Sequence, residues 1–233
     1  MKPFINTSYT IALLIVFLVL QSNFINGQIS KRIDSLALEY ASRGFNGNLL
    51  YSKNDSIVFT GNYGYSNFDT KTPLNDSTVF ELASVSKQFT ALAIVQLIEK
   101  KLLNYDTKVI EIIINFPYKN ITVEHLLRHQ SGLPDYQKIF YDKTNWNRKK
   151  MAFNQNVINV IAKLKLNLEF EPGSKYKYNN TGYVILASII EQVSRRSYQN
   201  YMTEYIFIPT GMLTSSVYNT QKEPKLNKNI ARG

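Results

Sequence analysis

A serine and a lysine lie three residues apart in the segment Glu81–Lys87 (ELASVSK), directly before an apolar run. At the start of a helix, this spacing puts the hydroxyl of Ser84 and the amine of Lys87 on one face. A lysine buried there can act as a neutral base or can hold another base anionic, and either action would make the serine a nucleophile. The backbone N–H of Ser84 is a candidate oxyanion donor. The structural alternative is a helix whose N-cap is Ser84 or Ser86.

A second group of candidates lies much later, in the segment Glu171–Tyr183 (EPGSKYKYNNTGY). A Pro-Gly turn leads there into a polar loop that runs straight into a helix pattern, so its side chains have a rigid support. If the loop is extended, Tyr178 and Asn180 point the same way, and a phenol and an amide can reach one cavity. A phenolate stabilised by Lys87 could then take the proton of Ser84. The alternative is that Tyr178 is an ordinary tyrosine and that Asn180 is the N-cap of the next helix.

Both histidines of the chain, His125 and His129, are four residues apart in the segment Glu124–Tyr136 (EHLLRHQSGLPDY). On a helix, this spacing allows two imidazoles to share a metal ion. The metalloprotease pattern, however, needs a glutamate directly after the first histidine, where this chain has a leucine. Acidic side chains nearby are only Glu124 and Asp135. We therefore predict structural histidines at a helix end and no metal site.

Hydrophobic periodicity predicts the elements that must position these groups. Two β-rich runs, Gly47–Ser52 and Ile57–Tyr65, are joined by a polar turn, which indicates a β-hairpin. From Ser86 onward the pattern is mostly helical. The first helix is apolar all round, which predicts that it is buried. Lys100 and Lys101 mark its C-terminal end, where positive charge is favourable. Further helices are predicted at Thr122–Arg128, Val157–Leu164, Thr181–Ser194 and Tyr198–Phe207, with a long connection at Asp135–Asn154.

The composition limits the classes of function. The chain has 233 residues, of which 44% are hydrophobic and 19% are charged, enough for a sizeable core in one domain. Its formal net charge is +10 without a block of five like charges, so the surface is basic in general and nucleic-acid binding is not predicted. The absence of cysteine excludes disulfides, a thiolate nucleophile, iron–sulfur clusters and Cys-ligated zinc.

The first residues predict a signal peptide at 1–27. Lys2 is the only charged side chain among the first 30 residues, and Tyr9–Leu20 (YTIALLIVFLVL) is almost entirely apolar. This apolar core of about a dozen residues is shorter than the roughly 20 residues that a membrane-spanning helix needs. We place cleavage after Gly27, which leaves 28–233 as a secreted or periplasmic domain. The alternative is an uncleaved membrane anchor.

Together, ELASVSK, HLLRHQSGLPDY, FEPGSKYKYNNTGY and the hairpin resemble the serine β-lactamase and penicillin-binding-protein superfamily. The Y-x-N form of the second motif resembles class C β-lactamases, D-alanyl-D-alanine carboxypeptidases and related esterases. The resemblance runs from about residue 34 to the C-terminus. It implies an α+β fold of the β-lactamase/transpeptidase type, with an N-terminal β-hairpin and a mostly helical domain. The implied roles are nucleophile for Ser84, helix partner for Lys87, proton transfer for Tyr178 and substrate-amide contact for Asn180.

A third family motif, K-T-G or H-x-G on a strand beside the site, does not occur before Gly233. The resemblance therefore implies that the C-terminal strands of the central sheet are missing, and we expect a fragment or truncated product. The missing strand would supply a second oxyanion N–H, and losing one such donor costs about 10²–10³ in rate. A two-stranded hairpin is also marginal alone, so folding and activity are both in question.

The predicted function is a secreted serine hydrolase that acts through an acyl-enzyme on a β-lactam, a D-Ala-type cell-wall peptide or an ester, impaired by the truncation. No cofactor or metal is predicted. The predicted partners are these small-molecule or peptide substrates, with no nucleic acid, and with membrane contact only through an uncleaved signal segment. The alternative is a non-catalytic periplasmic module with a degenerate hydrolase fold that binds cell-wall polymer through its basic surface. Substrate and oligomeric state are left open.

Overall fold

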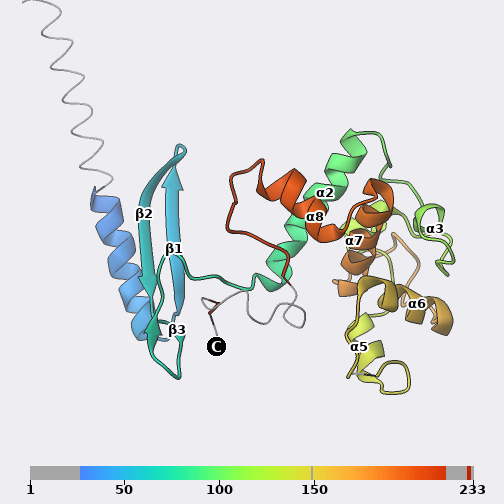
Figure 1. Ribbon diagram of the computed structural model, residues 1–233, viewed down its shortest axis with the longest axis horizontal. Helices are drawn as coiled ribbons and strands as arrows, with labels where there is room; N and C mark the ends of the chain where they lie inside the picture. The colour runs from blue at the N-terminus through green and yellow to red at the C-terminus, as the bar shows by residue number, and fades with distance from the viewer. Residues whose placement is uncertain (1–26, 148, 219–229, 232–233) are drawn as a thin grey trace, which may run out of the picture. The chain divides into compact units, whose positions relative to one another are not determined.

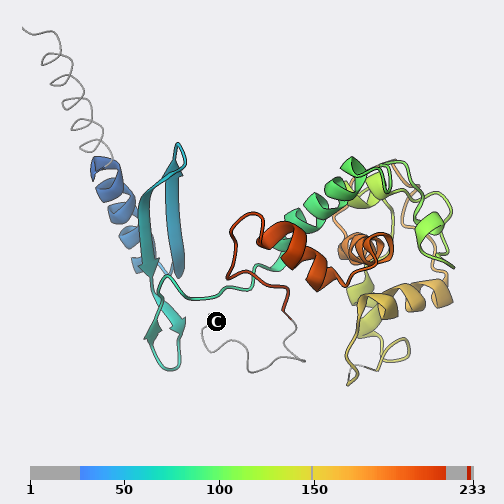
Figure 2. The same cartoon turned by 45° about the horizontal axis from the view of Figure 1, so that its top comes forward.

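The computed structural model describes residues 27–147, 149–218 and 230–231. These residues form two compact units (Figure 1, Figure 2). The first unit contains the described residues up to Glu81 together with Ile230 and Ala231, and the second begins at Leu82. The predicted signal peptide falls outside the described residues except for Gly27, which begins a helix.

The first unit contains the predicted hairpin. Strand β1 (Gly47–Lys53) pairs antiparallel with β2 (Ser56–Tyr63), which confirms the prediction from the two β-rich runs. Asn54 and Asp55 form the turn with positive φ angles of 49° and 58°. Asparagine and aspartate tolerate this conformation better than most residues, and it matches the twist of paired strands. The polar turn in the sequence was therefore a reliable signal.

A helix at residues 27–42 lies beside the hairpin (Figure 1), and the sequence analysis did not anticipate it. Its apolar side chains do not follow one face, since Leu36 is 55% exposed while the adjacent Ala37 is buried. The phenol of Tyr63 on β2 donates a hydrogen bond of 2.7 Å to Asp34 Oδ1 on this helix. Burial, followed by that bond and the carboxylate charge, raises the pKa of Tyr63 to about 12.

Short pairings complete this unit. Strands β3 (Tyr65–Asn67) and β4 (Thr72–Pro73) form a second small antiparallel ladder that was not predicted. Val79 and Ile230 form an isolated parallel bridge, in which the backbone N–H of Ala231 donates to the Val79 carbonyl at 2.9 Å. Among the described residues, the β structure is thus confined to this unit apart from one bridge between Lys108 and Thr122.

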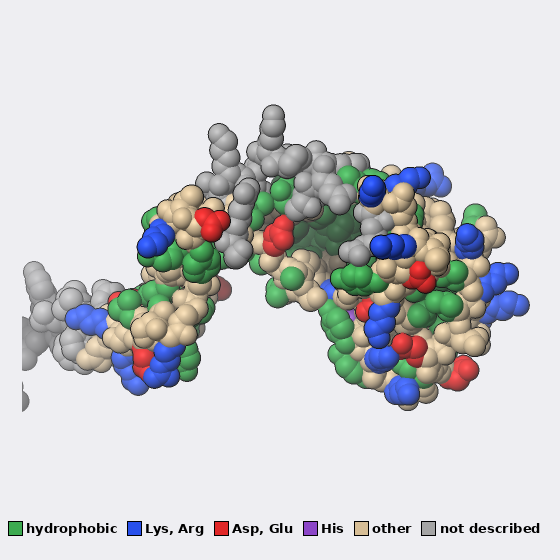
Figure 3. All heavy atoms as spheres, turned by 90° about the horizontal axis from the view of Figure 1, so that it is seen from below, with side chains coloured by type: hydrophobic (Ala, Val, Ile, Leu, Met, Phe, Trp, Pro, Cys, Tyr) green, Lys and Arg blue, Asp and Glu red, His purple; other side chains and the backbone are tan. Residues whose placement is uncertain are grey.

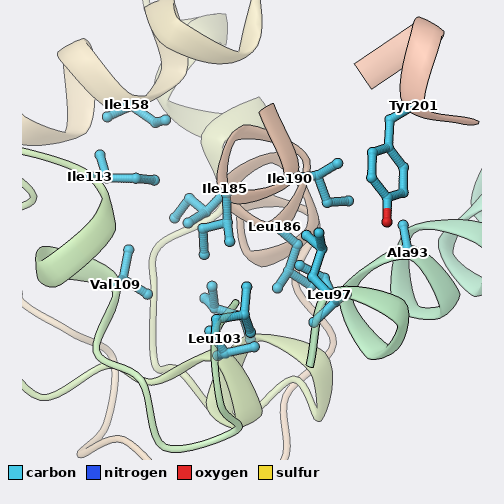
Figure 4. Close-up of a cluster of buried hydrophobic side chains, with 14 of the residues drawn as sticks. Ala93, Leu97, Leu103, Val109, Ile113, Ile158, Ile185, Leu186, Ile190 and Tyr201 are labelled. Carbon is cyan, nitrogen blue, oxygen red and sulfur yellow. The ribbon is translucent and has the colours of Figure 1, made fainter. Parts of the chain in front are cut away.

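The second unit is helical and is organised around α7 (Asn180–Ser194), which contacts most of the other helices (Figure 2). Ile185, Leu186 and Ile190 of α7 are fully buried, and Figure 4 shows them at the centre of the main apolar cluster. The helices that contact α7 are α2 (Lys87–Glu99), α3 (Val109–Ile112), α4 (Val123–Leu127), α5 (Tyr136–Tyr141), α6 (Asn154–Leu164) and α8 (Tyr198–Met202).

The helices predicted from periodicity are confirmed, with two corrections. Helix α2 is not buried all round, because Leu92 is 43% exposed while Ala93 and Leu97 on its other side are buried. The predicted connection Asp135–Asn154 contains α5, which the sequence analysis missed because aromatic and lysine residues mask its short pattern. The last predicted helix continues from α8 as a π-helical turn, η2 (Thr203–Phe207).

The face seen in Figure 3 carries basic side chains without one dominant cluster. Lys and Arg side chains are spread over the viewed face among acidic and apolar ones (Figure 3). No helix in the described part of the chain is long and apolar enough to cross a bilayer.

Candidate active site

Ser84 lies on a short 3₁₀ turn, η1 (Ala83–Ser86), that leads directly into α2. The residue before it, Ala83, has a φ of +45°, a left-handed conformation that costs a non-glycine residue free energy and is common near functional groups. Ser84 is not a cap, because the N-cap position of η1 is Leu82. Ser86 occupies the N-cap position of α2, as the structural alternative allowed, but its side chain makes no cap bond. The serine side chain is instead exposed and engaged elsewhere.

The structure brings the four predicted site residues together. Ser84 Oγ lies 2.6 Å from Tyr178 Oη and accepts a hydrogen bond of 3.1 Å from Lys87 Nζ. The same ammonium donates at 2.9 Å to Asn180 Oδ1. One lysine therefore connects the serine to the asparagine, while the phenol contacts the serine oxygen directly.

Lys87 is surrounded by oxygen acceptors and aromatic rings. Besides its two oxygen acceptors, its Nζ lies over the rings of Tyr178, at 5.0 Å from the centroid, and Tyr183, at 5.6 Å. Hydrogen bonding by this ammonium, followed by the bond with Ser84, lowers the pKa of the Tyr178 phenol. Of the two roles considered for the lysine, the contacts favour the one in which it holds another base anionic.

The two adjacent asparagines have different roles. Asn179, not Asn180, is the N-cap of α7, since its Oδ1 accepts the backbone N–H of Gly182 at 3.1 Å. Its Nδ2 donates at 2.7 Å to the carbonyl of Leu133, and the side chain is buried. The backbone at Asn179 is extended (φ −148°, ψ 127°), so Tyr178 and Asn180 both reach Lys87 from the same side.

Backbone hydrogen bonds hold the segment that carries Tyr178. We call residues 169–179 the strap and residues 129–133 the turn. The N–H groups of Glu169, Gly173 and Lys177 donate to carbonyls of the turn at 2.8 to 2.9 Å. Gly132 permits this approach: its φ is +69°, and a Cβ there would overlap the Phe170 carbonyl oxygen. The strap is therefore fixed against the turn along its length.

Comparisons with known proteins show the family of the chain. The sequence pattern of the Beta-lactamase family matches residues 36–231. The chain belongs to the β-lactamase family. Among curated relatives, Penicillin-binding protein 4* of Bacillus subtilis (strain 168) is 42% identical over 189 residues, which are 81% of this chain and 42% of that protein. Protein flp of Staphylococcus aureus (strain COL) is 29% identical over 76% of this chain and 36% of that protein, so the chain spans less than half the length of these relatives.

Solved structures place the fold in the same family. A penicillin binding protein from Bacillus halodurans aligns with a TM-score of 0.69 and 29% identity over 83% of this chain and 57% of that one. A penicillin-binding protein homologue from Pyrococcus abyssi aligns with a TM-score of 0.70 and 30% identity over 87% of this chain and 47% of that one. The fold is thus of the β-lactamase/transpeptidase type, as expected from the motifs.

The two histidines of this β-lactamase-family chain occupy different environments. His125 Nδ1 accepts the backbone N–H of Thr122 at 3.3 Å in a capping box at the start of α4, the structural use that was predicted. His129 lies against the Tyr178 ring, and sequence reasoning did not place it there. Within the described residues, no three His, Cys, Asp or Glu side chains cluster as a metal site would require.

Sequence reasoning also missed two other neighbours of the site. Tyr183 supplies the second ring beside Lys87, and Gln137 Oε1 accepts from Asn180 Nδ2 at 3.4 Å. The spacing of Tyr183 on α7 could have suggested it, because the third residue after Asn180 lies on the same helical face. No local signal marks Gln137, which α5 brings to the site.

Proposed function

We propose that this chain carries the acylation site of a secreted serine hydrolase of the penicillin-binding-protein type. Ser84 is the nucleophile, Tyr178 the proton-transfer residue and Lys87 the cation that keeps the phenolate accessible. The observation that supports this most strongly is the contact of 2.6 Å between Ser84 Oγ and Tyr178 Oη beside the Lys87 ammonium. A hydroxyl that contacts a base of lowered pKa is activated for attack.

The first half of the proposed reaction forms an acyl-enzyme. Ser84 Oγ attacks a carbonyl carbon of the substrate while its proton passes to the Tyr178 phenolate. The tetrahedral oxyanion is stabilised by the backbone N–H of Ser84. When the C–N or C–O bond breaks, the phenol returns the proton to the leaving amine or alkoxide, and the acyl group remains as an ester on Ser84.

The second half releases the acyl group. The regenerated phenolate of Tyr178 removes a proton from water, the hydroxide oxygen attacks the ester carbonyl, and Ser84 Oγ takes the proton back from the phenol. Lys87 remains an ammonium throughout, which its two oxygen acceptors and two aromatic faces support. Asn180 keeps Lys87 in place through Oδ1 and presents its Nδ2 side toward α5, where a substrate amide carbonyl can accept from it.

The substrate class is proposed from the relatives and from the exposure of the site. The solved relatives from Bacillus halodurans and Pyrococcus abyssi are a penicillin binding protein and a homologue of one, so we propose a β-lactam, a D-Ala-type cell-wall peptide or an ester. Tyr178 is 45% exposed and Ser84 is exposed, so a carbonyl carbon can approach the serine from solvent. Secretion is proposed from the apolar segment that precedes the described residues.

The test is covalent labelling of the purified full chain with a fluorescent penicillin and, separately, with a fluorophosphonate and an activated ester. The labelled peptide is identified by mass spectrometry. We expect an adduct on Ser84, which Ser84→Ala abolishes. Ser86→Ala is the matched control, because Ser86 lies in the same turn, is exposed and makes no cap bond, and it should leave labelling unchanged.

The outcomes separate the proposed substrates. An adduct with penicillin supports the penicillin-binding assignment, and an adduct with the ester or the fluorophosphonate alone supports an esterase. The absence of any adduct on Ser84 would overturn the proposal. Salt-sensitive binding to cell-wall polymer that survives Ser84→Ala, without labelling, would then favour the non-catalytic alternative.

A further inference from the structure

His129 packs against the catalytic tyrosine and its neighbours. Its ring centroid lies 4.7 Å from that of Tyr178 and 5.1 Å from that of Tyr183, with both ring pairs tilted by little more than 30°. The ring of Tyr176 meets it edge-on at 5.9 Å. The imidazole therefore fills the space between the strap and α7, beside the same two rings that contact Lys87.

Both sequence neighbours of Tyr178 are hydrogen-bonded to this one residue. The backbone N–H of Lys177 donates to the His129 carbonyl at 2.9 Å, and the backbone N–H of Asn179 donates to His129 Nδ1 at 3.2 Å. His129 has a φ of +55°, which turns its carbonyl and its ring toward the strap together. His129 thus packs against the ring of Tyr178 and accepts hydrogen bonds from the backbone N–H groups of both residues beside it.

The bond from Asn179 requires a particular form of the imidazole. Nδ1 can accept an N–H only when it carries a lone pair, so the proton of neutral His129 resides on Nε2. Partial burial, followed by the positive charge of Lys87, lowers the pKa of His129 and favours this neutral form. Protonation would replace the acceptor with a second donor that faces the Asn179 N–H and would place a second cation near Lys87.

The ionisable groups around His129 come from four segments. Four of these groups form two ion pairs and so neutralise one another within each pair: Arg128 with Glu124 at 2.8 Å, and Lys177 with Glu169 at 2.6 Å. Lys87 is then the charge that acts on the imidazole. Within the described part of the chain, these groups are Lys87 from α2, Arg128, Glu124 and His125 from α4 and its end, Tyr176, Tyr178 and the Lys177–Glu169 pair from the strap, and Tyr183 from α7.

We propose that His129 is a positioning residue for Tyr178: its neutral form holds the phenol against Ser84, and its protonation disturbs that placement. The titration of His129 then contributes to the acid limb of the acylation rate, beside the titration of the Tyr178 base itself. The acidic side chain that acts electrostatically on Tyr178 is Asp135. The inference rests on the proposed acylation of Ser84, and its test includes a readout that does not depend on acylation.

Two substitutions of His129 separate the effect of its aromatic ring from the effect of its Nδ1 acceptor. His129→Asn retains an acceptor oxygen and a residue type that tolerates positive φ, but it cannot be protonated. His129→Phe retains an aromatic ring and loses the acceptor. His125→Asn is the matched control, because it removes the other histidine of the chain, whose Nδ1 also accepts a backbone N–H, in this case that of Thr122 at the start of α4.

The first measurement is the rate of labelling by a fluorescent penicillin from about pH 5 to about pH 9. In the wild type and in His125→Asn, the rate should fall toward low pH. His129→Asn should lose the contribution of His129 to this fall, so its acid limb should change in shape and midpoint, and its plateau should stay within about tenfold of the wild type, since only ring packing is lost. His129→Phe should be labelled about 10- to 100-fold more slowly. The first-order rate constant of acylation should fall, and the penicillin concentration that gives half of the maximal rate should stay unchanged.

The second measurement follows the phenol without substrate. In protein with ¹³C at the tyrosine ζ carbon, the Tyr178 signal, assigned with Tyr178→Phe, should shift with the midpoint of the His129 imidazole signals. This coupling should vanish in His129→Asn and persist in His125→Asn. Circular dichroism establishes that each variant is folded, and the pH profile of His129→Asn decides the question if His129→Phe does not fold.

The results distinguish the two proposals. An acid limb that persists unchanged in His129→Asn, or a Tyr178 signal that is indifferent to His129, overturns the positioning role even when Ser84 is acylated. A coupled Tyr178 signal in a protein that no probe labels would retain the positioning role and overturn the proposed function instead.

Discussion

The hydroxyl of Ser84 contacts the phenol of Tyr178 at 2.6 Å, although 94 residues separate them along the chain. The contact joins the turn before α2 to the strap before α7. Both helices are anchored in one apolar cluster, so the position of each side chain depends on how the helices pack. The chemistry of the site is therefore sensitive to substitutions in the strap and the turn as well as at the serine.

Removal of the Tyr178 hydroxyl tests the proton-transfer role. Tyr178→Phe should leave the fold intact, because the ring remains against His129, and should slow labelling of Ser84 by about 10²–10⁴, the usual contribution of a positioned acid–base group. The labelling rate with a fluorescent penicillin or activated ester measures this. Tyr176→Phe, two residues earlier and 66% exposed, should label like the wild type. Equal rates for the two variants would refute the role of Tyr178.

Substitutions of the adjacent Asn179 and Asn180 should have opposite effects on stability and on labelling. Asn179→Ala removes the α7 cap and leaves the Leu133 carbonyl without its partner, so the free energy of unfolding should fall by about 2–4 kcal/mol. Asn180→Ala should change stability by less than about 1 kcal/mol, because the side-chain hydrogen bonds of Asn180 within the described residues are those with Lys87 and Gln137, while labelling of Ser84 slows. Urea denaturation and labelling rates measure the two effects. The reverse assignment would mean that Asn180 is structural.

Gly132 should be intolerant of any side chain. In Gly132→Ala, the positive φ and the overlap with the Phe170 carbonyl should together lower the free energy of unfolding by at least about 2 kcal/mol and displace the strap. Gly211 also has positive φ (72°), but a Cβ there meets nothing within 4 Å, so Gly211→Ala should lose only about 1 kcal/mol. Thermal melts of both variants measure the difference, and equal losses would show that the strap can move away from the turn.

The stability of the protein should depend on pH through His129. The pKa of its imidazole is lowered from 6.5 in the folded chain. Below about pH 6.5, the unfolded chain therefore binds more protons at this residue than the folded chain does. The free energy of unfolding should therefore fall as the pH drops from 6.5 through the folded pKa, and His129 should contribute no dependence above that range. Denaturant titrations of the wild type and His129→Asn measure this, and an identical slope in both proteins would contradict it.

Local patterns predicted most elements of the second unit. Apolar spacing gave the positions of α2, α4, α6 and α7 because a buried helix must repeat its apolar residues with the helical period. The same reasoning failed at residues 27–42 and at α5. The first has apolar side chains on several faces, and the second is a short helix whose pattern is too brief to stand out. Both are held by tertiary contacts, such as the bond from Tyr63 to Asp34, that leave no periodic signal.

The features of the site divide in the same way into those that local sequence patterns predict and those that they do not. The sequence by itself determined that Ser84 and Lys87 share a helical face and that Tyr178 and Asn180 lie on one side of an extended segment, because both relations follow from backbone geometry over a few residues. Only the tertiary structure decided that these pairs meet, that Asn179 is the cap and that His129 supports the tyrosine. Those relations depend on how the strap packs on the turn, and no spacing within either segment encodes the distance between them.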